Sequence, residues 1–384
     1  MEKCKLGDIC EIVSGSTPKT TIEEYWDGDV KWITPAELNE NVYIINDSVR
    51  KITKLAVEKT GLSSFPEGTV ILSTRAPIGK VAIAGCEMYC NQGFKNLICS
   101  EKIFNKYLYW FLKGNTMFLN SLGRGATFKE ISKAIVSEIE INVPEIEEQH
   151  EIVKVLEKVN TIIRFRKQEL SVLDTLVKAR FVEMFGDAVD NPMGWEKKQL
   201  QEIVTDDCTI SYGIVQTGND QEEGVPVFRP VDIVNRIPKL EELKRTTEEI
   251  SNKYKRTILK GHEMLITVRA NIADTCIVGK EFKGCNVGRG IVPIRTQENI
   301  MVLEFLKYLM DSKHLNDDIK SKAKGITLIQ LNMEDLREVE LIVPPIEQQK
   351  AFVEFAEQVD KSKVINQLLQ KWNYMCHVTI EKVK

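Results

Sequence analysis

The sequence predicts an α+β protein: two similar mixed α/β domains separated by two long antiparallel helices that form a coiled coil, giving an internal repeat with pseudo-two-fold symmetry. Its 384 residues, 43% of them hydrophobic, are enough to bury two cores. Segments 141–160 and 341–360, INVPEIEEQHEIVKVLEKVN and LIVPPIEQQKAFVEFAEQVD, match without a gap at an offset of 200 residues. Both open a long apolar periodic pattern, so each half of the chain is expected to end in a helix.

Four more blocks match in the same order along the two halves. At the offset of 200, GATFKEI (125–131) meets GITLIQL (325–331). Upstream the offset falls to about 195, where KWITPAEL meets PVFRPVDI, STRAPI meets TVRANI and CNQGF meets CNVGR. Chance similarity between short biased segments does not explain ordered matches, and the change in offset indicates loop insertions in a diverged repeat.

Within each half, short apolar runs bounded by turns predict strands. They are 70–74 with 81–84 in the first half, and 264–269 with 276–279 in the second. The patterns FNKYLYWFLKG and VLEFLKYLMDSK then predict helices, and the alternating apolar residues of 139–143 predict a closing strand. Each half is therefore expected to be a mixed domain that leads into a long helix.

The central helix is predicted over residues 144–185. Pro144 suits a first helical turn, the glutamates that follow it favour the positive end of the helix dipole, and Gly186 stops the pattern. A helix of this length spans about 60 Å at 1.5 Å per residue. Its apolar seam has the 4,3 spacing typical of a coiled coil and comprises Ile152, Leu156, Val159, Ile163, Leu170, Leu173 and Val177.

The second helix is predicted from Pro344 to the C-terminus, with a less regular seam. Because both helices belong to one chain, their effective concentration is high, and an internal antiparallel pair is the simplest arrangement. The alternatives are that each helix packs on its own domain or associates with another copy. The seam residues of the second helix are Phe352, Phe355, Val359, Leu369 and Trp372.

Composition limits the function classes. A net charge of −4 and a pI near 5.8 exclude a surface coated with basic residues that binds nucleic acid through phosphate charge alone, so any DNA contact must be local. The start MEKCKLGDICEIV lacks a signal-peptide core, and no segment has the apolar length of a membrane span. Nine scattered cysteines without CxxC pairs suit a reducing compartment, so a cytoplasmic protein is expected.

The catalytic motifs that the chain approaches each lack a residue that their chemistry requires. HEIVK (150–154) and HEMLI (262–266) begin like the zinc-binding HExxH motif but lack its second histidine. PIGKV and IVGKE lack the glycine and hydroxyl residues of a phosphate-binding loop, and there is no GxGxxG turn or NPPY-like methylation loop. We therefore expect no catalytic residue, metal or cofactor on this chain.

Several longer motifs carry a family resemblance. KLGDICEIVSGSTP opens the first half, MFGDAVDNPMGWEKKQL joins the central helix to the second half, and VPEIEEQ and VPPIEQQ open the two helices. With these motifs, the whole chain resembles the specificity subunits of Type I restriction-modification systems. The resemblance implies target-recognition domains over 1–143 and 187–343, with the helices 144–186 and 344–384 as spacers and docking surfaces.

The resemblance also implies partners. Specificity subunits are not enzymes: they bind double-stranded DNA and dock two methyltransferase subunits, which methylate adenine with S-adenosylmethionine. Separate restriction subunits use ATP and Mg²⁺ to cut DNA in the full complex. The resemblance therefore predicts a chain that recognises the target while its partners perform the chemistry.

DNA recognition needs guanidinium, ammonium and amide groups on loops, and both halves carry them in matched places. The main candidates are Arg75 and Lys80 of STRAPIGK, matched by Arg269 and Asn271 of TVRANIAD. The alternative is that each arginine caps a strand end or pairs with a carboxylate. The CNQGFKN and CNVGRG segments, which also suit plain turns, add Asn91, Gln92, Lys95, Asn286 and Arg289.

Basic clusters and further loops complete the predicted interface. Arg124 and Lys129 in the first half, and Lys322 and Lys324 in the second, precede the closing strands and suit either phosphate contact or a solvated helix end. The segments SGSTPK, DVKWITP and PVFRPVDI add Thr17, Lys19, Lys31 and Arg229.

The sequence thus favours a protein whose two domains each read a short half-site in the major groove of DNA, at a distance set by the helices. Because the loops differ, the target is expected to be asymmetric and bipartite, with half-sites about one helical turn, roughly 34 Å, apart. The competing hypotheses are a standalone two-domain DNA- or RNA-binding protein such as a repressor, a fragment of a methyltransferase or nuclease, and a coiled-coil scaffold.

Overall fold

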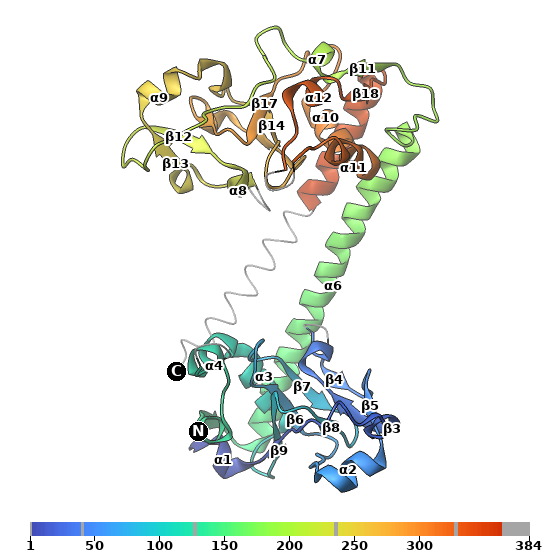
Figure 1. The fold of residues 1–384 in the computed structure, drawn as a ribbon, viewed down its shortest axis with the longest axis vertical. Helices are drawn as coiled ribbons and strands as arrows, with labels where there is room; N and C mark the ends of the chain where they lie inside the picture. The colour runs from blue at the N-terminus through green and yellow to red at the C-terminus, as the bar shows by residue number, and fades with distance from the viewer. Residues whose placement is uncertain (1, 40–41, 126–128, 234–236, 326–328, 363–384) are drawn as a thin grey trace. The chain divides into compact units, whose positions relative to one another are not determined.

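The computed structural model describes residues 2–39, 42–125, 129–233, 237–325 and 329–362 (Figure 1). The chain divides into two compact units: the first unit runs to Arg164, and the second unit begins at Phe165. Both mix short strands with helices, and the 40-residue helix α6 (Ile146–Phe185) contributes to each. Among the described residues, no helix combines the length and apolar content that crossing a bilayer requires.

A five-stranded sheet forms the frame of the first unit. Its order is β2 (Cys10–Ser14), β9 (Phe94–Cys99), β6 (Val70–Ser73), β7 (Val81–Ala84) and β4 (Ile44–Ile45). Strands β6 and β7 confirm the two strands predicted from turn-bounded apolar runs, and they pair antiparallel as a hairpin. Helix α3 (Asn105–Gly114), also predicted, contacts β6 and β7 and buries Leu108, Tyr109 and Leu112 in the core.

Two smaller sheets complete the first unit. Strand β3 (Trp26–Ile33) lies between β5 (Lys51–Ile52) and β8 (Tyr89–Cys90). Strand β1 (Glu2–Lys5) pairs antiparallel with β10 (Glu140–Val143), the strand predicted to close this half. The first strand of the chain is thereby bonded to the segment that leads into α6.

The second unit repeats this plan with shorter sheets. Strand β14 (Glu263–Thr267) pairs antiparallel with β15 (Thr275–Val278) and β17 (Ile291–Ile294), and β14 and β15 are the two strands predicted in this half. Another sheet has the order β13 (Lys244–Thr246), β12 (Val225–Phe228) and β16 (Asn286–Val287), and β11 (Lys197–Gln199) pairs with β18 (Glu340–Ile342). The predicted helix α10 spans Leu303–Met310.

Short helices link these strands, and hydroxyl caps define where several begin. The hydroxyls of Thr53, Ser132 and Thr247 accept a backbone N–H from the first turn of α2, α5 and α9. In the first unit these helices are α1 (Leu6–Ile9), α2 (Lys54–Thr60), α4 (Thr116–Leu122) and α5 (Lys133–Ser137), with 3₁₀ turns at Glu23–Tyr25 and Pro35–Glu37. In the second they are α7 (Leu200–Ile203), α8 (Pro230–Ile233), α9 (Glu248–Asn252), α11 (Lys313–Ser321) and α12 (Met333–Arg337), with 3₁₀ turns at Leu240–Glu242, Lys255–Thr257 and Lys280–Phe282.

One block of the predicted repeat is wrong in register. The sequence match pairs Cys90 with Cys285, but the strands place Cys90 opposite Ile33 and Val287 opposite Phe228. Ile33 and Phe228 are equivalent in the aligned KWITPAEL and PVFRPVDI blocks, so the counterpart of Cys90 is Val287. In the second half the string Cys-Asn-x-Gly begins at Cys285, two residues before the structural counterpart of Cys90. Only the pairing of the strands shows which residues are equivalent.

Helix α6 starts two residues after the predicted Pro144 and ends at Phe185. Gly186 follows with a φ of 74°, a left-handed conformation that glycine adopts without a Cβ clash and that terminates a helix. Of the seam predicted on this helix, Val177 is buried, whereas Ile152, Leu156, Val159, Ile163, Leu170 and Leu173 are half-buried. In the first unit, the buried apolar residue of α6 is Val153, one residue along from the predicted seam.

The C-terminal end of α6 packs into the core of the second unit through aromatic residues that the seam pattern omits. Phe181 and Phe185 are buried, and their ring centroids lie 5.4 and 5.7 Å from that of Phe352. Phe305 of α10 joins this cluster, with its ring 4.8 Å from that of Phe185. Since Phe352 belongs to the helical segment 346–362, the two helices meet here within a domain core.

The remaining seam residues of the second helix differ in placement. Val359 is buried and Phe355 is half-buried against the same core, while Leu369 and Trp372 lie outside the described residues. The guanidinium of Arg180, three residues after Val177 where the 4,3 spacing of the seam would continue, lies over the Phe355 ring, 6.0 Å from its centroid. An arginine at a seam position is therefore accommodated by an aromatic partner.

Candidate functional site

A cavity of about 740 Å³ opens on the first unit where several loops converge. Four predicted DNA-contact residues line it: Arg75, Lys80, Asn91 and Gln92. The sheet brings their loops together, because the last residue of β6 lies opposite the first residue of β9. The loop that follows β6 and the loop that precedes β9 therefore share one end of the sheet.

An ion-pair network in this cavity centres on Glu130. Nε of Arg75 donates to Oε2 of Glu130 at 2.9 Å, and Nζ of Lys95 lies 3.7 Å from Oε1. Lys80 donates from Nζ to the carbonyl oxygen of Pro35 at 3.0 Å. Two cations therefore flank the Glu130 carboxylate, and Lys80 adds a third cation to the lining of the cavity, so the excess positive charge suits a polyanionic ligand.

Two polar loop residues extend the cavity wall. The hydroxyl of Thr17 donates to Oε1 of Gln92, which is exposed. Within the described part of the chain, the NH₂ group of Gln92 has no protein partner, so it remains a donor for an outside acceptor. Oδ1 of Asn91 instead accepts the backbone N–H of Gly93 at 2.9 Å, so this amide shapes the turn.

Lys95 is placed differently from the prediction. It lies on β9 and is only 6% exposed, so its ammonium group faces the interior rather than a ligand at the surface. Burial lowers the pKa of this group, and attraction to Glu130 opposes that shift. Lys95 therefore contacts the Glu130 carboxylate from the interior of the unit and does not present its charge to DNA.

The other candidates of the first unit do not line this cavity. Lys31 donates to the carbonyl oxygen of Asn46 at 2.8 Å, which explains its half-buried position as a local structural bond. Lys19 is exposed. Arg124 and Lys129 are exposed at the two ends of one hairpin loop, where both suit a phosphate contact.

The second unit places Arg269 as the first unit places Arg75. Arg269 forms a backbone bridge with Gln330, just as Arg75 does with Glu130. The side chains meet as well, because Nη2 of Arg269 donates to Oε1 of Gln330. The recurrence predicted for the two arginines therefore extends to a partner residue on a distant hairpin.

The next two candidates lie on two loops, Asn271 between β14 and β15 and Arg289 between β16 and β17. Arg289 and Asn271 are both exposed. Gly290 allows the second of these loops to pack closely, because a Cβ at this position would lie only 2.4 Å from the ring of Pro230. A Cβ at Gly290 would also lie 3.4 Å from Cβ of Arg269, so the backbone next to Arg289 passes close to Arg269.

Two candidates of the second unit have local structural partners. Arg229 binds Asp232 through both Nε and Nη2, at 3.0 and 2.7 Å, and this carboxylate raises the pKa of the guanidinium. Asn286 is fully buried, accepts from Thr257 at 2.7 Å and donates to Ser251 at 2.9 Å. Asn286 therefore stabilises the interior, and its predicted contact with a base edge does not fit its position.

The two lysines of the second basic cluster also pair with carboxylates. Lys322 forms an ion pair with Asp318 one turn earlier on α11. Nζ of Lys324 lies 3.1 Å from Asp335. Because Lys324 remains largely exposed, it keeps the capacity to contact a phosphate, and the solvated-surface alternative applies equally.

The candidates chosen from sequence omit Glu130 and Gln330. Both lie at the same place in the matched segments GATFKEI and GITLIQL, directly before the closing apolar residue. Their type alone gives no signal, because a lone glutamate or glutamine is a common surface residue. Only the repeat, combined with a recurring arginine that needs a partner, points to them.

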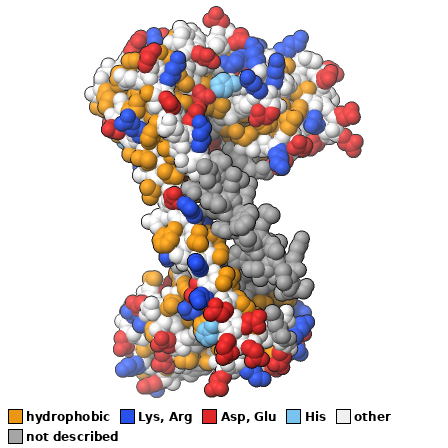
Figure 2. Space-filling view, turned by 180° about the vertical axis from the view of Figure 1, so that it is seen from behind, with side chains coloured by type: hydrophobic (Ala, Val, Ile, Leu, Met, Phe, Trp, Pro, Cys, Tyr) orange, Lys and Arg blue, Asp and Glu red, His pale blue; other side chains and the backbone are white. Residues whose placement is uncertain are grey.

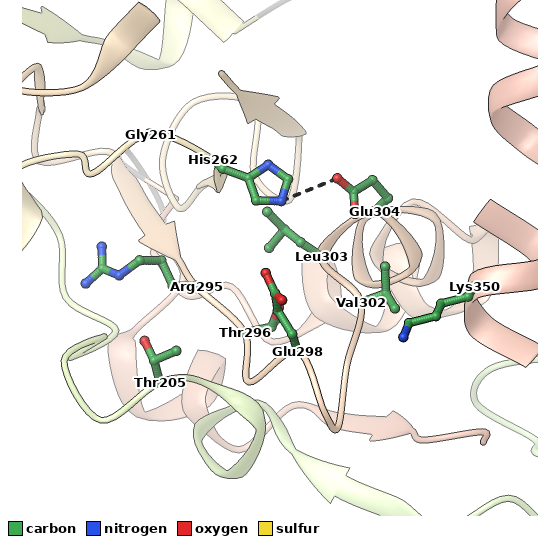
Figure 3. Close-up of a pocket in the computed structure, with 10 residues that line it drawn as sticks. All are labelled: Thr205, Gly261, His262, Arg295, Thr296, Glu298, Val302, Leu303, Glu304 and Lys350. Atoms are coloured by element: carbon green, nitrogen blue, oxygen red, sulfur yellow. Dashed lines mark ion pairs between the residues drawn. The ribbon is translucent and has the colours of Figure 1, made fainter. Parts of the chain in front are cut away.

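A second pocket, of about 390 Å³, lies in the second unit (Figure 3). Nε2 of His262 lies 3.5 Å from Oε1 of Glu304, and both side chains are partly exposed. Arg295 points away from this pair in Figure 3 and binds the buried Glu263 at 3.3 Å. His262, Glu304 and Arg295 therefore each have a charged partner within the protein.

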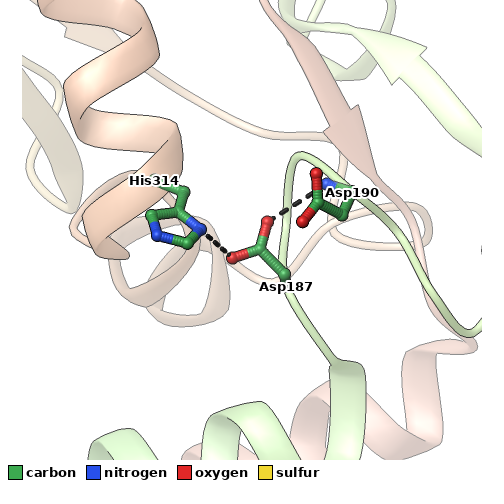
Figure 4. A group of neighbouring side chains, drawn as sticks. All are labelled: Asp187, Asp190 and His314. Atoms are coloured by element: carbon green, nitrogen blue, oxygen red, sulfur yellow. Dashed lines mark hydrogen bonds and ion pairs between the residues drawn. The ribbon is translucent and has the colours of Figure 1, made fainter.

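A compact group of Asp187, Asp190 and His314 follows the end of α6 (Figure 4). Asp187 accepts the backbone N–H groups of Val189 and Asp190 at 2.9 and 3.1 Å, and Nδ1 of His314 lies 2.5 Å from its other oxygen. Burial alone would raise the pKa of Asp187, but these backbone bonds and His314 outweigh it and lower the pKa. The group fixes the turn that connects α6 to the second unit's sheets.

The chain matches one protein family in both halves. The family model described as the Type I restriction modification DNA specificity domain matches residues 1–175 and again residues 192–371. The two matches reproduce the internal repeat, and together they cover most of the chain.

Curated proteins show the same similarity over most of their length. The Type I restriction enzyme MjaIX specificity subunit of Methanocaldococcus jannaschii is 32% identical over 371 residues, which cover 89% of this chain and 82% of that protein. The Type I restriction enzyme EcoBI specificity subunit of Escherichia coli is 24% identical over 356 residues, covering 83% and 74%.

Two solved structures share the fold. The S subunit of a Type I restriction-modification system from M. genitalium aligns with a TM-score of 0.56 at 14% identity, over 98% of this chain and 94% of that one. A chain from a structure of the assembly and conformational transition of the type I R-M system aligns with a TM-score of 0.58 at 19% identity, over 100% and 95%.

Proposed function

We propose that the two units of this chain each read one half of an asymmetric, bipartite DNA site. The chain belongs to the Type I restriction modification DNA specificity domain family and is a specificity subunit that recognises a DNA target. The proposed division is a recognition domain over 1–143, a spacer helix over 144–186, a second recognition domain over 187–343 and a closing helix over 344–384. Target recognition, and not catalysis, is the role of this subunit.

The observation that carries the proposal is that equivalent loops of the two units have the same backbone hydrogen bonds but side chains of opposite charge. Lys80 and Asp274 are equivalent, since their carbonyls accept the backbone N–H of Ser73 and of Thr267 at 2.9 and 3.0 Å. One unit therefore presents a cation where the other presents an anion, while an arginine recurs beside both. Because base edges are distinguished by donor and acceptor patterns, such a difference favours two unlike half-sites.

The exposed surface of α6 supports docking of partner subunits. Large apolar side chains remain exposed along this helix, among them Val155 at 53%, Val172 at 59%, Leu176 at 45% and Val182 at 58%. Figure 2 shows in orange that hydrophobic side chains reach the surface of the protein. Exposed apolar side chains on one helix are typical of helix-to-helix docking sites. The proposed occupants are two methyltransferase subunits, with restriction subunits joining the full complex.

The proposed partners supply the chemistry, and the compartment is the cytoplasm. Methyltransferase subunits would bring S-adenosylmethionine and extrude the target adenine from the duplex. Restriction subunits would bring ATP and Mg²⁺. This chain would recognise the target sequence, through the cavity around Arg75 in the first unit and the surface around Arg269 in the second.

The test is to map methylated bases in DNA from cells that express this chain with its methyltransferase, before and after residues 1–143 are replaced by those of a relative. We expect a bipartite motif in which one half changes and the other half and the spacer persist. A motif that is unchanged, or methylation that loses all sequence preference, would contradict the proposal. Tight, selective DNA binding by the chain without methyltransferase would favour a standalone repressor instead.

A further inference from the structure

Arg75 and Arg269 stand at one equivalent position of the two units, and so do the residues that bind them. Each arginine forms a backbone bridge with its partner, Glu130 in the first unit and Gln330 in the second. In both units, the residue after the partner donates its N–H to the carbonyl of the residue before the arginine, at 2.9 and 3.0 Å. The main chain is therefore the same, and only the side chains differ.

The two partners hold different edges of the guanidinium group. Glu130 accepts from Nε of Arg75 at 2.9 Å, and within the described residues both terminal amino groups of Arg75 bond to no protein atom. Gln330 accepts from Nη2 of Arg269, which is one of the terminal amino groups. Arg75 therefore presents its whole terminal edge to a ligand, whereas Arg269 presents only part of that edge.

A third position changes together with the partner. Leu72 and Ile266 each lie three residues before the arginine of their unit. The residue opposite Leu72 on the neighbouring strand is Lys95, and the residue opposite Ile266 is Val292. Lys95 approaches Glu130 to 3.7 Å, whereas Val292 and Gln330 are both neutral. The three residues 75, 95 and 130 together carry one net positive charge, as do 269, 292 and 330, so a lysine–glutamate pair in one unit replaces a valine–glutamine pair in the other.

We propose that residues 130 and 330 are specificity-determining positions that decide what the neighbouring arginine reads. Glu130 positions Arg75 through Nε, so that both terminal amino groups meet O6 and N7 of one guanine in the first half-site. Gln330 takes one N–H of Nη2 on Arg269, and within the described residues Nε of Arg269 has no protein partner, so the second unit does not fix its guanidinium plane for this end-on contact. This inference rests on the proposed function, in which each unit reads one half-site.

The chemistry requires a partner on Nε. A bidentate guanine contact needs two donors in a fixed plane, and a free arginine side chain loses rotamer freedom when it is fixed in one. The carboxylate of Glu130 fixes this plane before DNA binds, and the buried Lys95 holds the carboxylate in turn. Glu130 is therefore a positioning residue, while Arg75 makes the contact.

The experiment uses this chain assembled with its methyltransferase and a set of DNA duplexes in which each position of both half-sites is varied singly. The variants are Glu130→Gln and the double variant Glu130→Gln with Lys95→Val, which copies the second unit and leaves no unpaired buried lysine. In both, we expect the preference for guanine at one position of the first half-site to fall roughly ten- to hundredfold. The preferences at the other positions should remain.

Matched controls separate this effect from a general loss of stability. Glu138→Gln removes an equal charge from the same unit and should leave every preference unchanged, because the Glu138 carboxylate pairs on the surface with Lys5 at 2.6 Å and with no other described side chain. The reciprocal Gln330→Glu variant should alter one position of the second half-site alone. Slower methylation that is uniform at all positions in both Glu130 variants would overturn the inference.

The outcomes also distinguish this inference from the proposed function. If the unaltered complex shows no bipartite motif, the proposed function fails and the inference fails with it. If the motif is bipartite but both Glu130 variants keep the guanine preference, only the role of residue 130 is overturned.

Discussion

The buried amide of Gln149 accepts the backbone N–H of Phe104 through Oε1 at 2.7 Å. Its Nε2 group donates to the carbonyl oxygens of Lys102 and Pro144 at 2.9 and 2.8 Å, so the oxygen and both N–H groups of this amide are hydrogen-bonded. Gln149 lies on the first turns of α6 and is fully buried. One side chain thereby bonds the start of α6 to the segments of the first unit that precede it.

Gln349 repeats these three bonds in the second unit. It accepts from Val302 at 2.9 Å and donates to Ile300 and Pro344 at 3.0 and 2.8 Å. The shared glutamine of VPEIEEQ and VPPIEQQ is therefore explained by a structural need, since the chain must fix where each helix leaves its domain.

Replacing Gln149 should destabilise the first unit. The Gln149→Ala variant leaves a buried N–H and two carbonyls without partners, which we expect to cost on the order of 3 kcal/mol. Thermal unfolding of the purified chain measures the loss. Gln168→Ala, at an exposed position of the same helix, is the control and should leave the melting temperature nearly unchanged. Equal melting of the two variants would argue against the structural role of Gln149.

Truncating Phe352 should destabilise the second unit. Its ring is fully buried against Phe181, Phe185 and Phe305, so Phe352→Ala leaves a cavity that we expect to cost about 3–5 kcal/mol. Denaturant unfolding gives this free energy. Val182→Ala removes an exposed apolar side chain from α6 and should change stability by less than about 0.5 kcal/mol. A small effect at Phe352 would contradict the packing of the second helix into this core.

The docking of α6 on the first unit should depend on pH through Glu157. Its carboxylate accepts from Tyr43 at 2.7 Å and from Lys106 at 2.9 Å. Burial alone would raise its pKa, but the bonds from Lys106 and Tyr43 outweigh burial and bring the pKa below its ordinary value of 4.5.

Since the folded-state pKa of Glu157 is lowered, its stabilisation is present above the unfolded pKa and is lost as pH falls through the folded value. Glu157→Gln should therefore lower stability at pH 7, by less than about 1 kcal/mol because the pair is partly solvated. The difference from the unaltered chain should shrink below about pH 4. Glu151→Gln, on the exposed face, should show no such pH dependence, and a difference that persists in acid would refute this account.

Lengthening α6 should change the spacer of the DNA target and nothing else. A heptad inserted between Lys167 and Gln168 adds roughly 10 Å of helix at 1.5 Å per residue, which corresponds to about three base pairs at 3.4 Å each. Methylation mapping should then find both half-sites intact at a longer separation. An unchanged spacer, or a new half-site sequence, would show that the helix does not set this distance.

Local patterns in the sequence predicted much of the fold. The strands β6, β7, β14 and β15, the helices α3 and α10 and the long course of α6 follow from apolar periodicity and from the turn and cap residues that bound each segment. The repeat also predicted that Arg75 and Arg269 stand in equivalent loops. These features depend on neighbours in the chain, so a pattern over a few residues is enough to identify them.

Other features depend on which distant segments meet. Glu130 is 55 residues from the arginine that it binds, and no local pattern distinguishes it from a surface glutamate. Lys95 and Asn286 looked like loop residues, yet strand pairing buries both, and the same pairing moves the counterpart of Cys90 to Val287. Register and burial are decided only when the strands assemble.

The repeat that first indicated two similar domains was thus determined by the sequence alone, because repeated local patterns survive divergence of the loops. Tertiary structure decided how the two copies differ. Glu130 with Lys95 in one unit, and Gln330 with Val292 in the other, surround equivalent arginines with different hydrogen-bond partners. The physical reason is that a guanidinium group's free donors depend on which partner the fold brings to it, and that partner lies on another hairpin.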